Sequence, residues 1–199
     1  MTNDRHPTPA SPIERRVGAL EEALHERGHI PDGMMESAIA RAENELSPKN
    51  GAKVVARAWV DPAYRARLLE NSMAACAELG LNMANEKNIV VVENTPDIHN
   101  VIVCTQCSCT AWSLLGVPPD WYKSLAYRAR VVREARVLLG EMGLDVPAST
   151  TIRVWDTSGE SRFMALPLRP AGTEGWSEER LAAIVTREAM IGVARVEAR

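Results

Sequence analysis

Three of the four cysteines in this 199-residue chain lie within six consecutive residues, as Cys104, Cys107 and Cys109. Clustered thiols of this kind point to metal chemistry. Structural zinc is a poor fit, because it takes four tetrahedral ligands, usually from two Cys-x-x-Cys pairs or from one pair and two histidines. This sequence has no second pair, and its four histidines do not fall at such a spacing. The cluster therefore indicates another metal.

The spacing inside the cluster favours a planar ligand set. One residue separates Cys107 from Cys109, so both sulfurs can reach a metal together with the backbone amide nitrogens of Ser108 and Cys109. Cys104 could add an axial thiolate opposite an open position. Soft sulfur in this geometry suits a transition metal rather than zinc. A metal with an open position is a Lewis acid that can activate a substrate.

The residues in and after the cluster resemble the α subunit of nitrile hydratase. That family's metal-binding signature reads V-C-[ST]-L-C-S-C-[TY], and Val103–Thr110 here reads V-C-T-Q-C-S-C-T. The resemblance continues through Trp112 and Leu115–Pro119, then Tyr127–Glu134, and resumes at Arg169–Trp176. It spans roughly residues 60 to 195.

Three positions depart from the family's pattern without removing a ligand. Gln106 stands where the family usually has Leu, Ser113 where it usually has Pro, and Ala135 where it has the Pro of an R-E-P-R sequence. Because a proline in a helix interior imposes a kink, we expect Ala135 to let its helix run on without one.

The resemblance implies an enzyme, a hydro-lyase that hydrates nitriles to amides at a non-haem, low-spin metal(III) centre. The expected metal ligands are the sulfurs of Cys104, Cys107 and Cys109 and the backbone nitrogens of Ser108 and Cys109. By resemblance, Cys107 is oxidised to a sulfinate and Cys109 to a sulfenate. These two cysteines are also the expected catalytic residues.

The signature gives mixed signs about which metal is bound. Thr105 is more typical of cobalt members of the family, whereas Thr110 is more typical of iron members. The stretches Thr110–Trp112 and Asn94–Pro96 also look more iron-like. We therefore expect one iron(III) ion per αβ pair, with cobalt(III) as the alternative, because both ions accept this ligand set.

The resemblance also implies partners. A β subunit would form an αβ heterodimer or an α₂β₂ heterotetramer and would bring two arginines to the oxidised cysteines. A small nitrile is the implied substrate, and a metallochaperone or activator protein is a further candidate partner. In this chain we expect Trp112 to line the substrate pocket and Arg162 to support the site, while Asn85 is the approximate counterpart of a family Gln.

Two other functions stay open: a thiocyanate hydrolase-like subunit, which shares the cysteine motif, and a non-catalytic metal-binding or redox-sensing module. The formal charge of -3 comes from mixed charges without a basic stripe, so we expect no nucleic-acid partner. The N-terminus is polar and no apolar run is long enough for a membrane span, so we expect no membrane contact and a cytoplasmic location.

The first part of the chain should be helical. Apolar spacing predicts one helix from Pro12 to about Gly28, capped by Ser11, and a second over 34–46, followed by a break at 47–51. The apolar stripes of both helices need a surface to cover them. We therefore assign residues 1–48 to an extended helical arm that contacts the β subunit, and residues 49–199 to a catalytic metal-binding domain.

The second part should mix helices and strands. We expect strands at 88–93 and 100–103, the latter ending at Cys104, and an antiparallel strand pair across a turn at 157–159. Helices are expected at 53–59, 61–79, 124–142 and 178–190, with a final strand at 191–196. This pattern indicates an α+β fold, and the resemblance implies an α-β-β-α layered sandwich with an N-terminal helical arm.

Three further residue types carry simple expectations. His99 should be a surface residue at a strand end rather than a catalytic base. Cys76 should be an inert core residue, because free cysteines are commonly buried. The arginines of the 124–142 helix should mostly face solvent, although any one of them near the metal could be a hydrogen-bond donor to the site.

Overall fold

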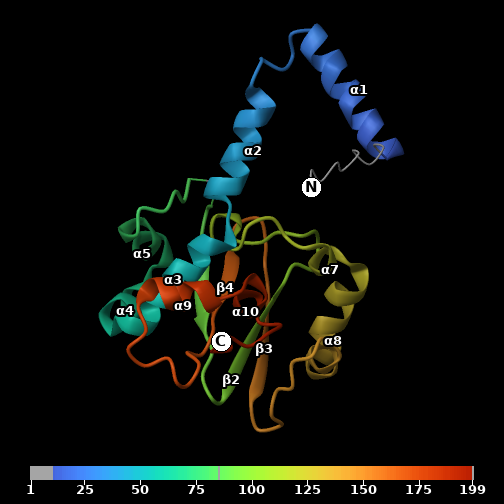
Figure 1. Cartoon of the computed structure of the whole chain (residues 1–199). Helices are drawn as coiled ribbons and strands as arrows, with labels where there is room; N and C mark the ends of the chain where they lie inside the picture. The colour runs from blue at the N-terminus through green and yellow to red at the C-terminus, as the bar shows by residue number, and fades with distance from the viewer. Residues whose placement is uncertain (1–10, 85, 199) are drawn as a thin grey trace, which may run out of the picture. The chain divides into compact units, whose positions relative to one another are not determined.

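Helix α1 (Pro12–Glu26) begins as its sequence predicts (Figure 1). The Ser11 hydroxyl accepts the Glu14 N–H at 3.3 Å, and the Glu14 carboxylate accepts the Ser11 N–H at 2.5 Å. This reciprocal pair satisfies two backbone donors that a helix start leaves free. Gly28, with φ of 68°, follows the helix end. Helix α2 (Met34–Glu45) also lies within its predicted range.

The computed structural model describes residues 11–84 and 86–198. These residues divide into two compact units, which meet between Arg41 and Ala42, inside α2. In the first unit, α1 has no buried residue, and Ile13, Val17 and Leu20 are all exposed. The assignment of residues 1–48 to an arm stays a prediction.

The second unit starts with three helices, α3 (Pro48–Val60), α4 (Pro62–Glu70) and α5 (Ser72–Glu78). The predicted break at 47–51 is wrong, because Ser47 caps α3 and Pro48 occupies its first turn. Gly51 lies inside this helix. The position needs glycine, because a Cβ there would lie 2.5 Å from the carbonyl oxygen of Leu114. The predicted single helix over 61–79 is divided at Asn71, whose side chain caps α5.

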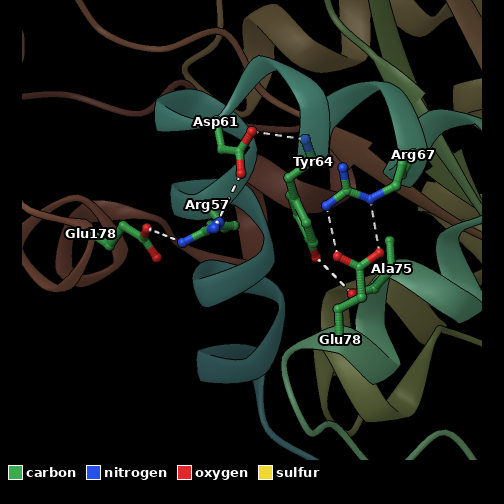
Figure 2. Close-up of polar contacts among 7 residues, drawn as sticks. All are labelled: Arg57, Asp61, Tyr64, Arg67, Ala75, Glu78 and Glu178. Atoms are coloured by element: carbon green, nitrogen blue, oxygen red, sulfur yellow. Dashed lines mark hydrogen bonds and ion pairs between the residues drawn. The ribbon is translucent and has the colours of Figure 1, made fainter.

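Ion pairs join these helices at the surface (Figure 2). Arg57 of α3 contacts Asp61, the cap of α4, at 3.1 Å and Glu178, the first residue of α9 (Glu178–Ile184), at 2.9 Å. Arg67 of α4 binds both carboxylate oxygens of Glu78 in α5. Exposed pairs contribute little stability. The buried apolar residues hold these helices together, and the ion pairs add contacts between the helices at the surface.

In the described part of the chain, four strands form two parallel pairs. Strand β1 (Ile89–Glu93) pairs with β4 (Arg162–Leu166), and β2 (Ile98–Val103) pairs with β3 (Thr151–Asp156). The predicted antiparallel pairing of β3 with β4 is therefore wrong. The N–H of Thr157 donates to the Val103 carbonyl at 2.6 Å, so the chain continues along β2 before it turns.

Helices cover the strands on two sides. Helices α4 and α5 lie against β1, the two sheets contact each other through β2, and α8 (Leu125–Glu141) lies against β3. Figure 1 shows α4 and α5 on one side of the strands and α8 on the other. The mixed α+β class is confirmed. No helix in the described part of the chain combines the length and hydrophobicity that a membrane crossing needs.

Helix α8 is kinked, which contradicts the expectation for Ala135. Glu134 has φ of −141° and ψ of 43°, outside the helical region. The helix segments on each side have separate tertiary anchors. Tyr127 is buried before the kink, while Arg136 after it donates to the carbonyl oxygens of Val146 and Pro147, both at 2.7 Å. Removing the proline does not straighten the helix, because packing and hydrogen bonds keep the two segments at an angle.

The C-terminal region departs from the prediction at two points. The helix predicted over 178–190 is split into α9 and α10 (Arg187–Ile191), because the Thr186 hydroxyl accepts the Ala189 N–H and starts a new helix. The strand predicted at 191–196 is absent from the described structure there. Gly192 ends α10 with φ of 92°, so close to Asn100 that a Cβ would lie 2.0 Å from its carbonyl oxygen.

Candidate metal centre

The three clustered cysteines converge at the end of β2. The Sγ atoms of Cys104 and Cys107 are 3.4 Å apart, those of Cys107 and Cys109 are 3.0 Å apart, and all three lie within 4.8 Å of one another. Two sulfurs in neighbouring positions of an octahedron, each about 2.3 Å from the metal, would be about 3.3 Å apart. The geometry therefore fits three thiolates around one ion, with Cys104 buried and Cys107 exposed.

The clustered thiols shift one another's pKa values. The pKa of Cys107 is lowered to about 7, because its sulfur accepts hydrogen bonds from Cys109 first and then from Cys104. The pKa of Cys109 is raised to about 11, first by its hydrogen bond to Cys107 and then by burial. A metal deprotonates the thiols that bind it.

Asp156 fastens the start of the cluster loop. It is the last residue of β3 and pairs in register with Val103, the last residue of β2. Its carboxylate accepts the Thr105 N–H at 2.9 Å and the Thr105 hydroxyl at 2.5 Å. The loop therefore leaves the sheet in a defined direction immediately after Cys104.

Arg128 of α8 holds the middle of the loop. Its Nη1 donates to the carbonyl oxygen of Cys107 at 2.9 Å. The other arginines of this helix make contacts outside the cysteine loop. Arg130 pairs with two glutamates, Arg133 donates to a carbonyl of its own helix, and Arg136 binds the 146–150 segment. Arg128 is thus the arginine of this helix that contacts the cysteine loop.

Two buried tyrosines donate hydrogen bonds to backbone carbonyls of the loop and of the strand that precedes it. The Tyr122 hydroxyl of α7 (Asp120–Lys123) donates to the carbonyl oxygen of Cys109 at 3.0 Å, and the Tyr127 hydroxyl donates to that of Ile102 at 2.7 Å. Burial raises the pKa of both phenols, so both remain protonated donors. These bonds fix backbone positions on both sides of the cluster.

Trp112 and Arg162 lie together at the C-terminal end of the loop. Arg162, the first residue of β4, donates Nη1 to the Thr110 carbonyl at 2.7 Å, and its guanidinium lies 5.8 Å from the centre of the Trp112 ring. Trp112 begins α6 (Trp112–Leu115) and is 41% exposed. Both predicted residues are therefore beside the cysteine loop, and their roles in substrate binding and support stay predictions.

Sequence reasoning missed Asp156, which contacts the loop, and Glu86, which lies beside it. It included Arg128 only as one of several arginines on its helix. Asp156 is found only when the β2–β3 register is known, and Arg128 only when α8 is placed against the loop. The one available signal was the arginine-rich helix itself. Asn85, the counterpart of a family Gln, lies outside the described residues.

His99 is not a surface residue, which corrects the prediction, but its contacts lead away from the cluster. It is half-buried, and its Nε2 lies 2.8 Å from the carbonyl oxygen of Gly192. Its Nδ1 lies 3.5 Å from the side-chain nitrogen of Asn94. The ring therefore ties β2 to the end of α10. Cys76 is fully buried, as predicted, and burial raises its pKa to about 12.

The half-buried His99 should make stability depend on pH. Burial lowers the pKa of His99 in the native chain below its usual value of 6.5. At a pH between these two pKa values, the unfolded chain therefore binds more protons than the native chain. Stability is then full above pH 6.5 and declines as the pH falls through this window. Thermal melts between about pH 8 and about pH 5 should show a smaller decline in His99→Gln, which cannot titrate. His99→Ala should largely keep the reaction of the cysteine site, and a complete loss would mean that the ring takes part in it.

Several known proteins are similar to this chain over most of its length. The family model for "Nitrile hydratase, alpha chain" matches residues 11–194. A nitrile hydratase subunit alpha from Rhodococcus sp. is 52% identical over 186 residues, which are 93% of this chain and 94% of that protein. A cobalt-containing nitrile hydratase subunit alpha from Pseudonocardia thermophila is 52% identical, over 91% of this chain and 89% of that protein. The solved structure of a double mutant of Fe-type nitrile hydratase from Comamonas testosteroni Ni1 superposes with a TM-score of 0.88 at 49% identity, covering 96% of this chain and 93% of that chain.

Proposed function

This chain belongs to the nitrile hydratase alpha chain family, and we propose that its cysteine loop binds the metal ion at which nitriles are hydrated. The chain is the catalytic α subunit of a nitrile hydratase, which adds water to a nitrile to give an amide. The proposed ligands are the sulfurs of Cys104, Cys107 and Cys109 and the backbone nitrogens of Ser108 and Cys109. The observation that carries the proposal is the convergence of the three sulfurs within 4.8 Å.

The bound metal would supply Lewis acidity, which makes the carbon of a nitrile open to attack by water. The chain's own part is to hold the loop still and keep one side of it accessible. Cys107 is exposed and Cys109 is partly exposed, while Cys104 is buried, so the cluster is reached from the Cys107 side. We assign the nucleophile to the oxygen of an oxidised Cys109 or to a water activated beside it.

The proposed oxidation state is a sulfinate at Cys107 and a sulfenate at Cys109. The exposure of Cys107 and the partial exposure of Cys109 support oxidation there, because access to the sulfur helps control how readily a cysteine oxidises. Peptide mass spectrometry of active enzyme should find added oxygen on both residues. Fully reduced thiols in active enzyme would contradict this assignment.

We propose iron(III) as the metal, with one ion per αβ pair. The support for iron is the resemblance of Thr110 and its neighbours to iron members of the family. Thr110 is buried here, and its hydroxyl donates to the Gly116 carbonyl at 3.2 Å. The relatives include both a cobalt-containing and an Fe-type enzyme. Elemental analysis of the purified complex distinguishes the two, and stoichiometric cobalt would overturn the choice of iron.

We propose a β subunit as the partner of the N-terminal helices, in an αβ heterodimer or an α₂β₂ heterotetramer. The exposed apolar residues of α1 support this, because such a stripe usually marks an interface. Val17→Asp with Leu20→Asp should therefore weaken recovery of the α–β complex in co-purification. A matched change on the same helix, Glu21→Gln with Glu22→Gln, should not, and equal recovery of both variants would contradict the assignment.

We also propose that the covering helices and two sheets form the α-β-β-α sandwich of the family. The order α4/α5, β1–β4, β2–β3, α8 supports this layering. A cytoplasmic location is proposed because clustered thiols that bind metal belong in a reducing compartment.

The experiment that tests the function is co-expression of the full chain with its β partner in iron-supplemented medium. We expect a coloured complex with a visible sulfur-to-metal charge-transfer band that converts small aliphatic and aromatic nitriles to amides. A loaded complex that hydrolyses thiocyanate but no nitrile would support a thiocyanate hydrolase-like subunit instead. A colourless, zinc-loaded and inactive complex would favour a non-catalytic metal-binding module.

A further inference from the structure

Glu86 is a buried carboxylate beside the cysteine loop. Its side chain is 0% exposed. One oxygen, Oε1, accepts the backbone N–H of Ser113 in α6 at 2.9 Å. The other, Oε2, has no hydrogen-bond partner and lies 3.6 Å from Nη1 of Arg162. A charge this deeply buried is costly unless it is paired, so the arrangement needs Arg162 to stay in place.

Arg162 carries the contact from Glu86 to the loop. Its side chain is only 18% exposed, and the same Nη1 donates to the Thr110 carbonyl at 2.7 Å. Strand pairing brings the two residues together, because Arg162 begins β4 and its N–H donates to the Asn88 carbonyl at 2.9 Å, just before β1. Glu86 and Asn88 both lie in the short segment that leads into β1.

The two contacts of Glu86 reach the chain on both sides of Trp112. Ser113 is held directly, and Thr110 is held through Arg162. Thr110 directly follows Cys109, the last sulfur ligand of the proposed site. The carboxylate therefore constrains the end of the ligand loop together with the exposed indole beside it.

We propose that Glu86 is a positioning residue of the metal centre, which places Cys109 and Trp112 through Ser113 and Arg162. This proposal rests on the proposed metal site. It assigns a role to a carboxylate that touches neither metal nor substrate. Groups that orient ligands in this way typically change metal affinity or activity about 10- to 100-fold when they are removed.

The test is Glu86→Gln in the full α chain, co-expressed with the β subunit. Glutamine keeps an acceptor for the Ser113 N–H but removes the charge that faces Arg162. We expect a shifted charge-transfer band, less metal per complex and a kcat/KM lowered about 10- to 100-fold. The control is Glu93→Gln, because Glu93, the last residue of β1, also pairs with an arginine, Arg65 of α4, in a more exposed contact. The control should keep the wild-type band and metal content.

A double-variant cycle separates positioning from general stability. If Glu86 acts through Arg162, adding Glu86→Gln to Arg162→Gln should change the band no further than Arg162→Gln alone. If Glu86→Gln fails to fold, Arg162→Lys provides the readout, since lysine keeps the charge but lacks the planar guanidinium that fixes the geometry of both contacts. The same band shift is expected there.

An unchanged band and metal content in folded Glu86→Gln would overturn the proposal. So would a lower melting temperature without a spectral change, because that result describes a purely structural role. A wild-type complex that binds no metal would instead remove the proposed function itself. The wild-type measurement therefore distinguishes the two failures.

Discussion

Replacing Cys109 with serine is expected to abolish nitrile hydration and to remove the visible charge-transfer band. The Cys109 sulfur lies 3.0 Å from that of Cys107, and both are more exposed than Cys104. A hydroxyl is a harder and less acidic donor than a thiol, so it suits this metal poorly. Changes outside the ligand set cost about 10- to 100-fold, and loss of a ligand should exceed that range. Steady-state kinetics and metal analysis of the co-expressed complex provide the measurement.

Cys76→Ala is the matched control for this result. It also removes one thiol, but Cys76 is fully buried in α5, and burial accounts for its raised pKa. We expect a stability loss of about 1–2 kcal/mol from the lost packing, with metal content and kcat unchanged. Substantial hydration by Cys109→Ser would show that the sulfur of Cys109 is not needed for the reaction.

Replacing Arg128 with alanine should have the second largest effect. Its guanidinium reaches from α8 to the carbonyl oxygen of Cys107 at 2.9 Å, a charge-assisted hydrogen bond to the middle of the loop. Without it, the carbonyl loses its donor and the Cys104–Cys109 segment gains freedom. We expect kcat/KM to fall about 10- to 100-fold and the metal to exchange faster with a chelator.

Arg133→Ala is the corresponding control on the same helix. Arg133 is exposed, and its Nε donates to the Ala129 carbonyl within α8. This variant should exchange its metal at the wild-type rate. Equal exchange rates in Arg128→Ala and wild type would mean that the contact to Cys107 does not restrain the loop. Hydrogen exchange of the loop amides gives an independent measure of the same restraint.

The loop is thus held on several sides by residues far apart in sequence. Asp156 binds its start, Arg128 its middle, and Tyr122 and Arg162 its end. Each of these side chains contacts backbone rather than sulfur. The cysteines therefore take their positions from the backbone that carries them, before any metal contributes.

Local features of the chain were readable from the sequence because their causes are local. The capped start of α1 at Ser11 and the four strand positions depend on neighbouring residues, which set backbone preference and apolar spacing. The cysteine cluster was also found this way, since Cys104, Cys107 and Cys109 are too close in sequence to be far apart in space.

The pairing of the strands and the contacts around the loop were decided by tertiary structure. The apolar side chains of residues 151–166 predict two strands but do not name their partners, and the observed partners are β2 and β1. Ala135 likewise does not straighten α8, since Arg136 anchors the segment after the kink. The sequence by itself brings the three cysteines together. The contacts of Asp156 and Arg128 with their loop, and the position of Glu86 beside it, follow from strand register and helix packing, which depend on the whole domain.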